Sequence, residues 1–425
     1  MRRLVFLPLF ALLLVLPACG SGTIGDLFAI FPPEAFEDPG AGDGGGLPGQ
    51  FIASEIAALG GGQGVTGEIR NVVLATVASR TYAFLTAQTD GVHVVDVTDP
   101  LILNSTDFVT TIDDAHLSSP AASIAGGRVD AVAVVDNTFL VCLAIGSGAV
   151  NAVTVFDITL LIEAATNSEA DLSGAFITPA GTGIAAPGNS AGKAGGVAGS
   201  GSAFFVATGG PDVIPAVIDP GTATWLEGAA LDTGATVVET LDVQVNGTSS
   251  IHVSGRGPGG AYGIVALAHP ALPIPTTPEI ETIDVEDFDD IDDFNESVRD
   301  IAGPGNFPLD IALDTLTLLL TSDEKVLIYN VSNPFSPSLL TTIENTGFDT
   351  IAVDSDGGVT VIGAGDTLLI ASTALGQARV TGQVDFAGSI VIRGVALFST
   401  DDGTFALCCG GQTGLRVVQL SQTAQ

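Results

Sequence analysis

The sequence predicts an all-β protein, a seven-bladed β-propeller of four-stranded antiparallel blades whose ring is closed by an N-terminal strand. The composition supports this fold, because 54 glycines with 46% hydrophobic and only 14% charged residues are typical of many short buried strands joined by tight turns. A short strand pattern also recurs along the chain, and a second strand pattern precedes most of its copies. No long helical pattern is visible between them.

The recurring pattern is a run of β-forming residues that ends in a polar residue, followed by an aliphatic residue and then Thr or Ser, as in Val97-Thr98 and Val331-Ser332. Two copies close with Asp99-Pro100 and Asn333-Pro334, and because proline cannot donate a hydrogen bond to a sheet, it marks the end of a strand. The four clear copies are Val92–Asp96, Val153–Asp157, Val326–Asn330 and Leu415–Gln419.

Two further strands are expected ahead of each copy. The nearer one carries an aromatic residue near its start and is joined to the repeat strand by a short glycine-rich turn, which indicates a hairpin. The clear examples are Thr81–Leu85, Thr138–Cys142, Ala203–Ala207 and Thr404–Cys408. The first strands of the units are expected at Val72–Ala78, Val129–Val135, Ala194–Gly199, Val237–Val245, Leu309–Leu313, Phe348–Val353 and Val391–Phe398. Weaker repeat strands at Ile214–Pro220, Gly263–Pro270 and Thr367–Ala371 bring the number of units to seven.

A strand at Phe51–Leu59 is expected to complete the last blade. The sequence stops soon after the third strand of the last unit, whereas Phe51–Leu59 is a β-like stretch that precedes the first unit. A propeller avoids exposed sheet edges by radial repetition, so this stretch is predicted to be the missing outer strand. The main alternatives for the fold are a β-solenoid and a pair of β-sandwiches.

The strand endings VHVVD, VTVFD, VLIYN and LRVVQ resemble the repeat of the LVIVD family of bacterial exported β-propeller proteins. The resemblance covers the chain from about Phe51, is good in four units and is eroded in three. It implies a propeller of a kind often found on lipoproteins or cell-surface proteins. It implies no common activity and no catalytic set.

The N-terminus predicts export. Residues 1–18 contain Arg2, Arg3 and an apolar run to Leu16, which is the layout of a signal peptide too short to span a membrane as a mature helix. Leu16 to Cys19 resemble a bacterial lipobox, which implies that Cys19 is lipidated and is the first mature residue; an ordinary signal with an incidental Cys19 is the alternative. By resemblance to Gram-negative lipoproteins, Gly20 in place of Asp does not argue for retention in the inner membrane, and an outer-membrane location in the cell envelope is expected. Residues 19–50, rich in glycine and proline, are expected to be a flexible tether for a propeller at 51–425.

The charge of the chain excludes some classes of partner. With 48 acidic and 12 basic residues, the formal net charge is −36. Nucleic acid and anionic lipid surfaces would be repelled, so no nucleic acid partner is expected. We expect a monomer whose only link to the membrane is the lipid on Cys19.

An acidic run between the fourth and fifth units is the one stretch that suggests a metal. Closely spaced oxygens suit Ca²⁺, but the run lacks the alternating ligands and the sixth-position glycine of an EF-hand. A solvated acidic insertion is therefore the preferred interpretation, with calcium as the alternative and no other cofactor expected. Its carboxylates include Asp287, Asp289, Asp290, Asp292, Asp293 and Glu296.

Histidines and cysteines give no clear catalytic pattern. His93 lies within a repeat strand and is expected to face outward. His116 and His252 lie near the expected entries to inner strands, so they are candidates for a pore-mouth site, although a structural role is the default for each. Cys142 and Cys408 occupy equivalent positions and are expected to be buried and unpaired.

Two functions remain from the sequence. The first is a noncatalytic propeller that binds, or acts as a scaffold for, another envelope or extracellular protein or a glycan. The second is a propeller enzyme, a hydrolase or lyase, with carboxylates and His116 or His252 at the pore mouth. No catalytic residue can be named, and the absence of a recognisable triad favours the first.

Overall fold

A computed structural model describes most of the chain after residue 50. The described residues are 51–60, 63–87, 90–113, 128–145, 153–167, 169, 171–181, 183–184, 196–233, 239–246, 250–256, 262–268, 310–322, 325–333, 337–343, 350–373, 378–386, 390–411 and 414–422. The chain divides into two units, residues 1–47 and 48–425, and every described residue belongs to the second. The signal peptide, Cys19, His116 and the acidic run with Asp287, Asp289, Asp290, Asp292, Asp293 and Glu296 lie outside the described residues.

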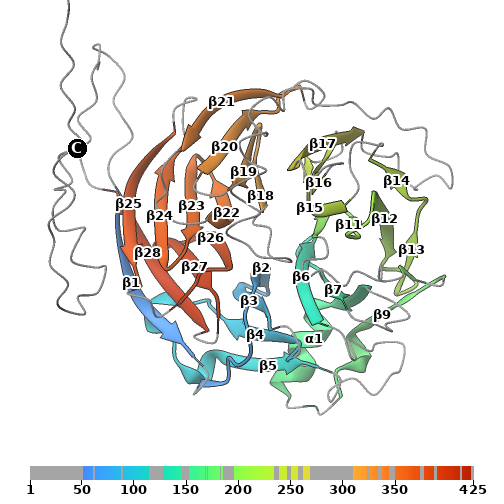
Figure 1. Cartoon of the computed structure of the whole chain (residues 1–425). Coiled ribbons are helices and arrows are strands. Elements are labelled where there is room, and N and C mark those ends of the chain that lie inside the picture. The colour runs from blue at the N-terminus through green and yellow to red at the C-terminus, as the bar shows by residue number, and fades with distance from the viewer. Residues whose placement is uncertain are drawn as a thin grey trace, which may run out of the picture. The chain divides into compact units, whose positions relative to one another are not determined.

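Within the second unit the described elements are almost entirely β-strands, grouped in antiparallel sheets (Figure 1). The first two groups are β2 (Asn71–Val77), β3 (Arg80–Thr86), β4 (Val92–Asp96) and β5 (Phe108–Ile112), then β6 (Arg128–Val135), β7 (Phe139–Ile145), β8 (Val153–Asp157) and β9 (Phe176–Pro179). The next two are β10 (Val197–Ser200), β11 (Ala203–Ala207), β12 (Asp212–Asp219), β13 (Thr224–Glu227) and β14 (Leu231–Asp232), then β15 (Glu239–Asn246), β16 (Ser250–Arg256) and β17 (Tyr262–Ala268).

The C-terminal half continues the same order of strands. It contains β18 (Ile311–Asp314), β19 (Thr317–Ser322), β20 (Lys325–Asn330) and β21 (Ser338–Ile343), then β22 (Thr350–Asp356), β23 (Val359–Ala364), β24 (Thr367–Ser372) and β25 (Arg379–Asp385). The last sheet has β26 (Gly394–Thr400), β27 (Gly403–Cys409) and β28 (Leu415–Gln422) in the order β1-β28-β27-β26, where β1 is Phe51–Leu59.

The first strands of these groups lie next to one another in sequence order. Contacts join β2 to β6, β6 to β10, β10 to β15, β15 to β18, β18 to β22 and β22 to β26, and β26 returns to β2. In each sheet this strand is at one end of the hydrogen-bonded order, so one of its edges has no ladder partner. The first strands therefore surround a common space, onto which these edges open (Figure 1).

β1 pairs antiparallel with β28 along its whole length, from Phe51 opposite Gln422 to Leu59 opposite Leu415. A strand from the start of the described chain thus completes a sheet made by its end. Two other outer strands, β9 and β13, pair in parallel, so the second and third groups share one sheet.

The polar residue that ends several of the repeat strands has a local structural role. The side chains of Asp96, Asp219 and Asn330 accept hydrogen bonds from the backbone N–H two residues ahead, at 3.0, 2.9 and 2.8 Å, which starts the turn that leaves the strand. Asp157 accepts from the N–H of Leu160 at 3.0 Å and caps α1 (Ile158–Thr166), a short helix that the sequence did not predict.

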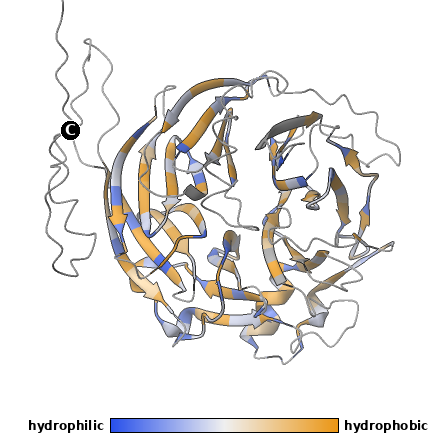
Figure 2. Ribbon diagram, viewed as in Figure 1, coloured by the Kyte–Doolittle hydropathy of each residue, from blue (hydrophilic) through white to orange (hydrophobic). Residues whose placement is uncertain are grey.

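The core lies between neighbouring sheets, where hydrophobic residues line the strands (Figure 2). The aromatic residues of the second strands fill much of it, and Phe84, Phe204, Phe205 and Phe405 are completely buried. Hydrophobic clusters combine residues from two adjacent groups of strands, so no sheet buries its faces alone.

We expect Leu59→Ala to lower the free energy of unfolding by about 2–5 kcal/mol, because it removes a completely buried side chain of β1 that belongs to a hydrophobic cluster with residues of β2, β27 and β28. Ile52→Ala on the same strand is the control: Ile52 is 61% exposed, so its change should stay within about 0.5 kcal/mol. Urea denaturation followed by fluorescence measures both. Equal effects of the two substitutions would show that β1 does not contribute to the core.

Candidate functional site

A cavity of about 380 Å³ lies between the first strands. All its lining residues come from β2, β6, β10, β15, β18, β22, β26 or the residues directly before these strands. Its volume is near the lower end of the range for small-molecule sites. Because the lining residues run from Arg70 to Leu397, the cavity is built from parts of the chain that are far apart in sequence.

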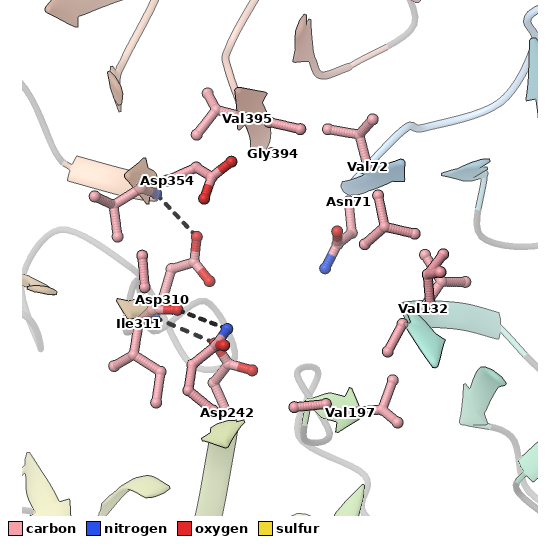
Figure 3. Close-up of a pocket in the computed structure, with 18 of the residues that line it drawn as sticks. Asn71, Val72, Val132, Val197, Asp242, Asp310, Ile311, Asp354, Gly394 and Val395 are labelled. Atoms are coloured by element: carbon pink, nitrogen blue, oxygen red, sulfur yellow. Dashed lines mark hydrogen bonds between the residues drawn. The ribbon is translucent and has the colours of Figure 1, made fainter. Parts of the chain in front are cut away.

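Three carboxylates lie on one side of this cavity, across from Asn71, Val72 and Val132 (Figure 3). Asp242 is on β15, Asp310 directly precedes β18, and Asp354 is on β22. These three elements are consecutive first strands, so the carboxylates form a continuous arc, called here the aspartate arc.

Each carboxylate of the aspartate arc accepts a hydrogen bond from the next first strand. The N–H of Ile311 donates to Asp242 Oδ2 at 3.2 Å, and the N–H of Val353 donates to Asp310 Oδ2 at 2.9 Å. The N–H of Leu397 on β26 donates to Asp354 Oδ2 at 2.7 Å. The arc therefore joins four consecutive first strands by side-chain hydrogen bonds, at edges that have no ladder partner.

Asp242 also requires a glycine on its other neighbour. A Cβ atom added to Gly196, directly before β10, would lie 1.8 Å from Asp242 Oδ1. The absence of a side chain at Gly196 therefore leaves the space that the carboxylate occupies between β10 and β18.

The pKa of Asp354 is raised to about 7. The main cause is burial of the carboxyl group among the first strands; the charges of Asp310 and Asp356 raise the pKa further. The N–H groups of Leu397 and Ser355 act in the opposite direction, since both donate to the carboxylate.

Two arginines line the cavity beside β26 and β2, the first strands that follow the aspartate arc. Arg393 directly precedes β26 and Arg70 directly precedes β2, and Arg70 pairs with Glu68 at 3.2 Å. The cavity lining therefore carries both signs of charge, with negative groups on three strands and positive groups beside two others. Among the described residues no group of His, Cys, Asp and Glu is arranged to hold a metal ion.

The histidines named from the sequence do not converge on this cavity. His252 is in β16 and is 1% exposed, and its Nε2 lies 3.2 Å from Ser250 Oγ. Burial lowers its pKa to about 4. It is not a cavity-lining residue. The expectation that His93 faces outward is wrong: it is 1% exposed, and its ring nitrogens lie 2.8 Å from Thr111 Oγ1 and 2.7 Å from the carbonyl oxygen of Thr66.

The described cysteines are structural. Cys142, Cys408 and Cys409 are free and completely buried, as expected for the first two, and burial raises the pKa of each thiol. A buried thiol with a raised pKa is a poor nucleophile, so these residues offer no reactive site.

The aspartate arc was not identified from the sequence. One signal was available: Leu241-Asp242-Val243 and Leu309-Asp310-Ile311 both place a carboxylate between two aliphatic residues in an expected first strand. A charged residue in such a buried position needs a partner. Sequence alone does not show that the partner is the backbone of the following unit.

Comparison with known proteins identifies the fold. No protein-family model and no curated protein sequence matches the chain. The solved structure of the RRP9 WD40 repeats matches 88% of this chain and 99% of its own, with a TM-score of 0.55 and 11% identity. The U3-55K structure matches the same shares with a TM-score of 0.54 and 10% identity.

An extracellular domain from B. thetaiotaomicron, part of the two-component system protein BT4673, is also similar. It matches 87% of this chain and 39% of its own, with a TM-score of 0.50 and 11% identity. WD40 repeats form β-propellers. The described unit thus has a β-propeller fold, and identities this low carry no information on function.

None of the helices in the described part of the chain has the length and apolar character needed to cross a membrane.

Gly196→Ala should lower the free energy of unfolding by about 1–3 kcal/mol, because the new methyl group would displace the Asp242 carboxylate. Gly174→Ala is the matched control, since a Cβ at Gly174 meets no atom within 4 Å. Thermal unfolding followed by circular dichroism compares the two variants. A Gly196→Ala variant as stable as the control would mean that the Asp242 carboxylate can move at no cost.

Proposed function

We propose that this chain is an exported, lipid-anchored β-propeller that acts as a noncatalytic binding or scaffold module for another envelope or extracellular protein or a glycan. The observation that carries this proposal is that the aspartate arc joins neighbouring first strands. The carboxylates most suited to chemistry in the cavity each accept a backbone N–H from a neighbouring strand. They hold the propeller together, which leaves recognition to the loops and outer strands.

We also infer that the propeller has seven blades and that β1 closes the ring. The cyclic contacts of seven first strands support the number of blades, if the nine-stranded sheet is divided where β9 meets β13. Pairing of β1 with β28 supports the closure. The four clear repeat strands are consistent with an LVIVD-type propeller.

An enzyme with a site at the pore mouth is the second candidate. Asp354 favours it, because a carboxyl group with a pKa near 7 that faces a cavity could serve as a general acid. The position of His252 opposes it, since this buried side chain does not line the cavity. His116 would then have to supply the second group. We place the binding function first for this reason.

The proposal includes a location, an oligomeric state and a cofactor state. The lipobox-like Leu16 to Cys19 and the following Gly20 support a lipid anchor on Cys19 and the outer membrane. The domain acts as a monomer without a cofactor, and the acidic run from Asp287 to Glu296 is a solvated insertion rather than a calcium site.

Site-specific photo-crosslinking of the intact chain in the cell envelope tests the binding function. Ile102 follows a third strand and Val391 precedes a first strand, so antiparallel order puts them at opposite ends of the strands, and both are exposed, at 67% and 46%. We expect one of the two positions to give a discrete adduct with an envelope protein or glycan. No adduct at either position, together with a hydrolase or lyase activity that Asp354→Asn abolishes, would overturn the proposal in favour of the enzyme.

The lipid anchor is tested by Cys19→Ala, which should move the protein from the membrane fraction to the soluble fraction, because the acyl chains are the proposed attachment. Cys142→Ala is the control, since that thiol is buried in the propeller and should leave the fractionation unchanged. Immunoblotting of the two fractions gives the result. Membrane retention of the Cys19 variant would contradict lipidation at this residue.

A further inference from the structure

Asp354 connects two first strands through both of its carboxylate oxygens. Oδ2 accepts from the N–H of Leu397 on β26 at 2.7 Å, and Oδ1 accepts from the N–H of Ser355 on its own strand, β22, at 2.9 Å. The contact between β22 and β26, called here the β22–β26 seam, therefore includes a hydrogen bond from one ionisable side chain, beside a hydrophobic cluster that contains Ala352 of β22 and Val395 of β26. Both Asp354 and Leu397 also line the cavity.

The charged groups around Asp354 are mostly negative. On β22 itself lies Asp356; β18 carries Asp314 and is preceded by Asp310, and β26 is preceded by Arg393. The other neighbours, β19 and β23, contain no ionisable residue. The charges that act on Asp354 most are those of Asp310 and Asp356.

The neighbouring carboxylates already accept hydrogen bonds from backbone N–H groups. Asp310 Oδ2 accepts from the N–H of Val353, directly before Asp354, and Asp314 Oδ2 accepts from the N–H of Gly358 at 2.8 Å. Ser355 Oγ also donates to Asp314 Oδ2 at 3.4 Å. This region thus concentrates carboxylates along two adjacent strands, β18 and β22, and an additional negative charge on Asp354 is electrostatically unfavourable while the seam is closed.

We propose that Asp354 makes the β22–β26 seam pH-responsive: the seam is closed while this carboxyl group is neutral, and ionisation shifts it toward an open form in which the carboxylate is hydrated. A neutral carboxyl group still accepts the N–H of Leu397 without adding charge next to Asp310 and Asp356. Opening would change the lining of the cavity, because both partners of this hydrogen bond belong to it.

The direction of the pH effect follows from linkage. The pKa of Asp354 is about 7 in the closed seam, against an ordinary value of 3.8. Because the closed seam binds the proton more tightly than the open form, it is stabilised at low pH. This stabilisation is complete below pH 3.8 and is lost as the pH rises from 3.8 to about 7. From pH 5 to pH 8 the equilibrium constant for opening should rise by up to about a hundredfold. His252, whose pKa is lowered to about 4, has the opposite effect on global stability, so the test must be local to the seam.

Amide hydrogen exchange of the intact chain, measured by mass spectrometry between pH 5 and pH 8, tests the proposal. After correction for the intrinsic pH dependence of exchange, peptides from β26 that contain Leu397 should lose protection as the pH rises. Peptides from β11, which has no ionisable residue, provide an internal reference. In Asp354→Asn the additional loss of protection in β26 should disappear, because the side chain cannot ionise.

Asp401→Asn, at an exposed turn between β26 and β27, is the matched control and should keep the wild-type response. The wild-type measurement stands without the variants if Asp354→Asn does not fold. Either of two results would overturn the proposal: corrected wild-type exchange in β26 that follows β11 at every pH, or an unchanged pH response in a folded Asp354→Asn protein.

Discussion

Each sheet of this protein depends on its two neighbours to bury its faces. A four-stranded sheet with apolar side chains on both faces is not stable in water, and the hydrophobic clusters here join residues from adjacent sheets. The first strands must therefore pack side by side, and each presents an unpaired edge to the central space. Those edges carry backbone N–H groups that require partners.

The aspartate arc provides partners for such N–H groups on β18, β22 and β26. Asp242, Asp310 and Asp354 accept N–H groups from the strands that follow them, and the amide of Gln244 donates to the carbonyl oxygen of Ile311 at 3.0 Å. Carboxylates are strong acceptors, but each adds negative charge to a confined space. Burial is the main cause of the raised pKa of Asp354, and the charge of Asp310, its neighbour in the arc, raises that pKa further.

The sequence predicts the strands better than the side-chain environments. Alternation, turn residues and the repeat locate the strands and the pairing partner of Phe51–Leu59, because these depend on local chemistry and on a pattern repeated many times. His93 was assigned to the surface because its counterparts are Thr154, Leu327 and Arg416. Its ring contacts Thr111 on β5 and also Thr66, which lies before the first unit's strands and belongs to no repeat. A repeat pattern cannot predict a partner outside the repeat.

The repeat residues and the cavity residues differ in how they vary along the chain. The residues that make the repeat recognisable, such as Asp96, Asp157 and Asn330, start turns or cap a helix, and they do so in several units. The cavity differs from unit to unit, since carboxylates line it on three consecutive strands and arginines lie beside the two that follow. A symmetric array of strands thus encloses an asymmetric charge distribution. The carboxylates of the cavity accept backbone N–H groups and so serve the fold, which leaves recognition to the loops and outer strands, where the units also differ.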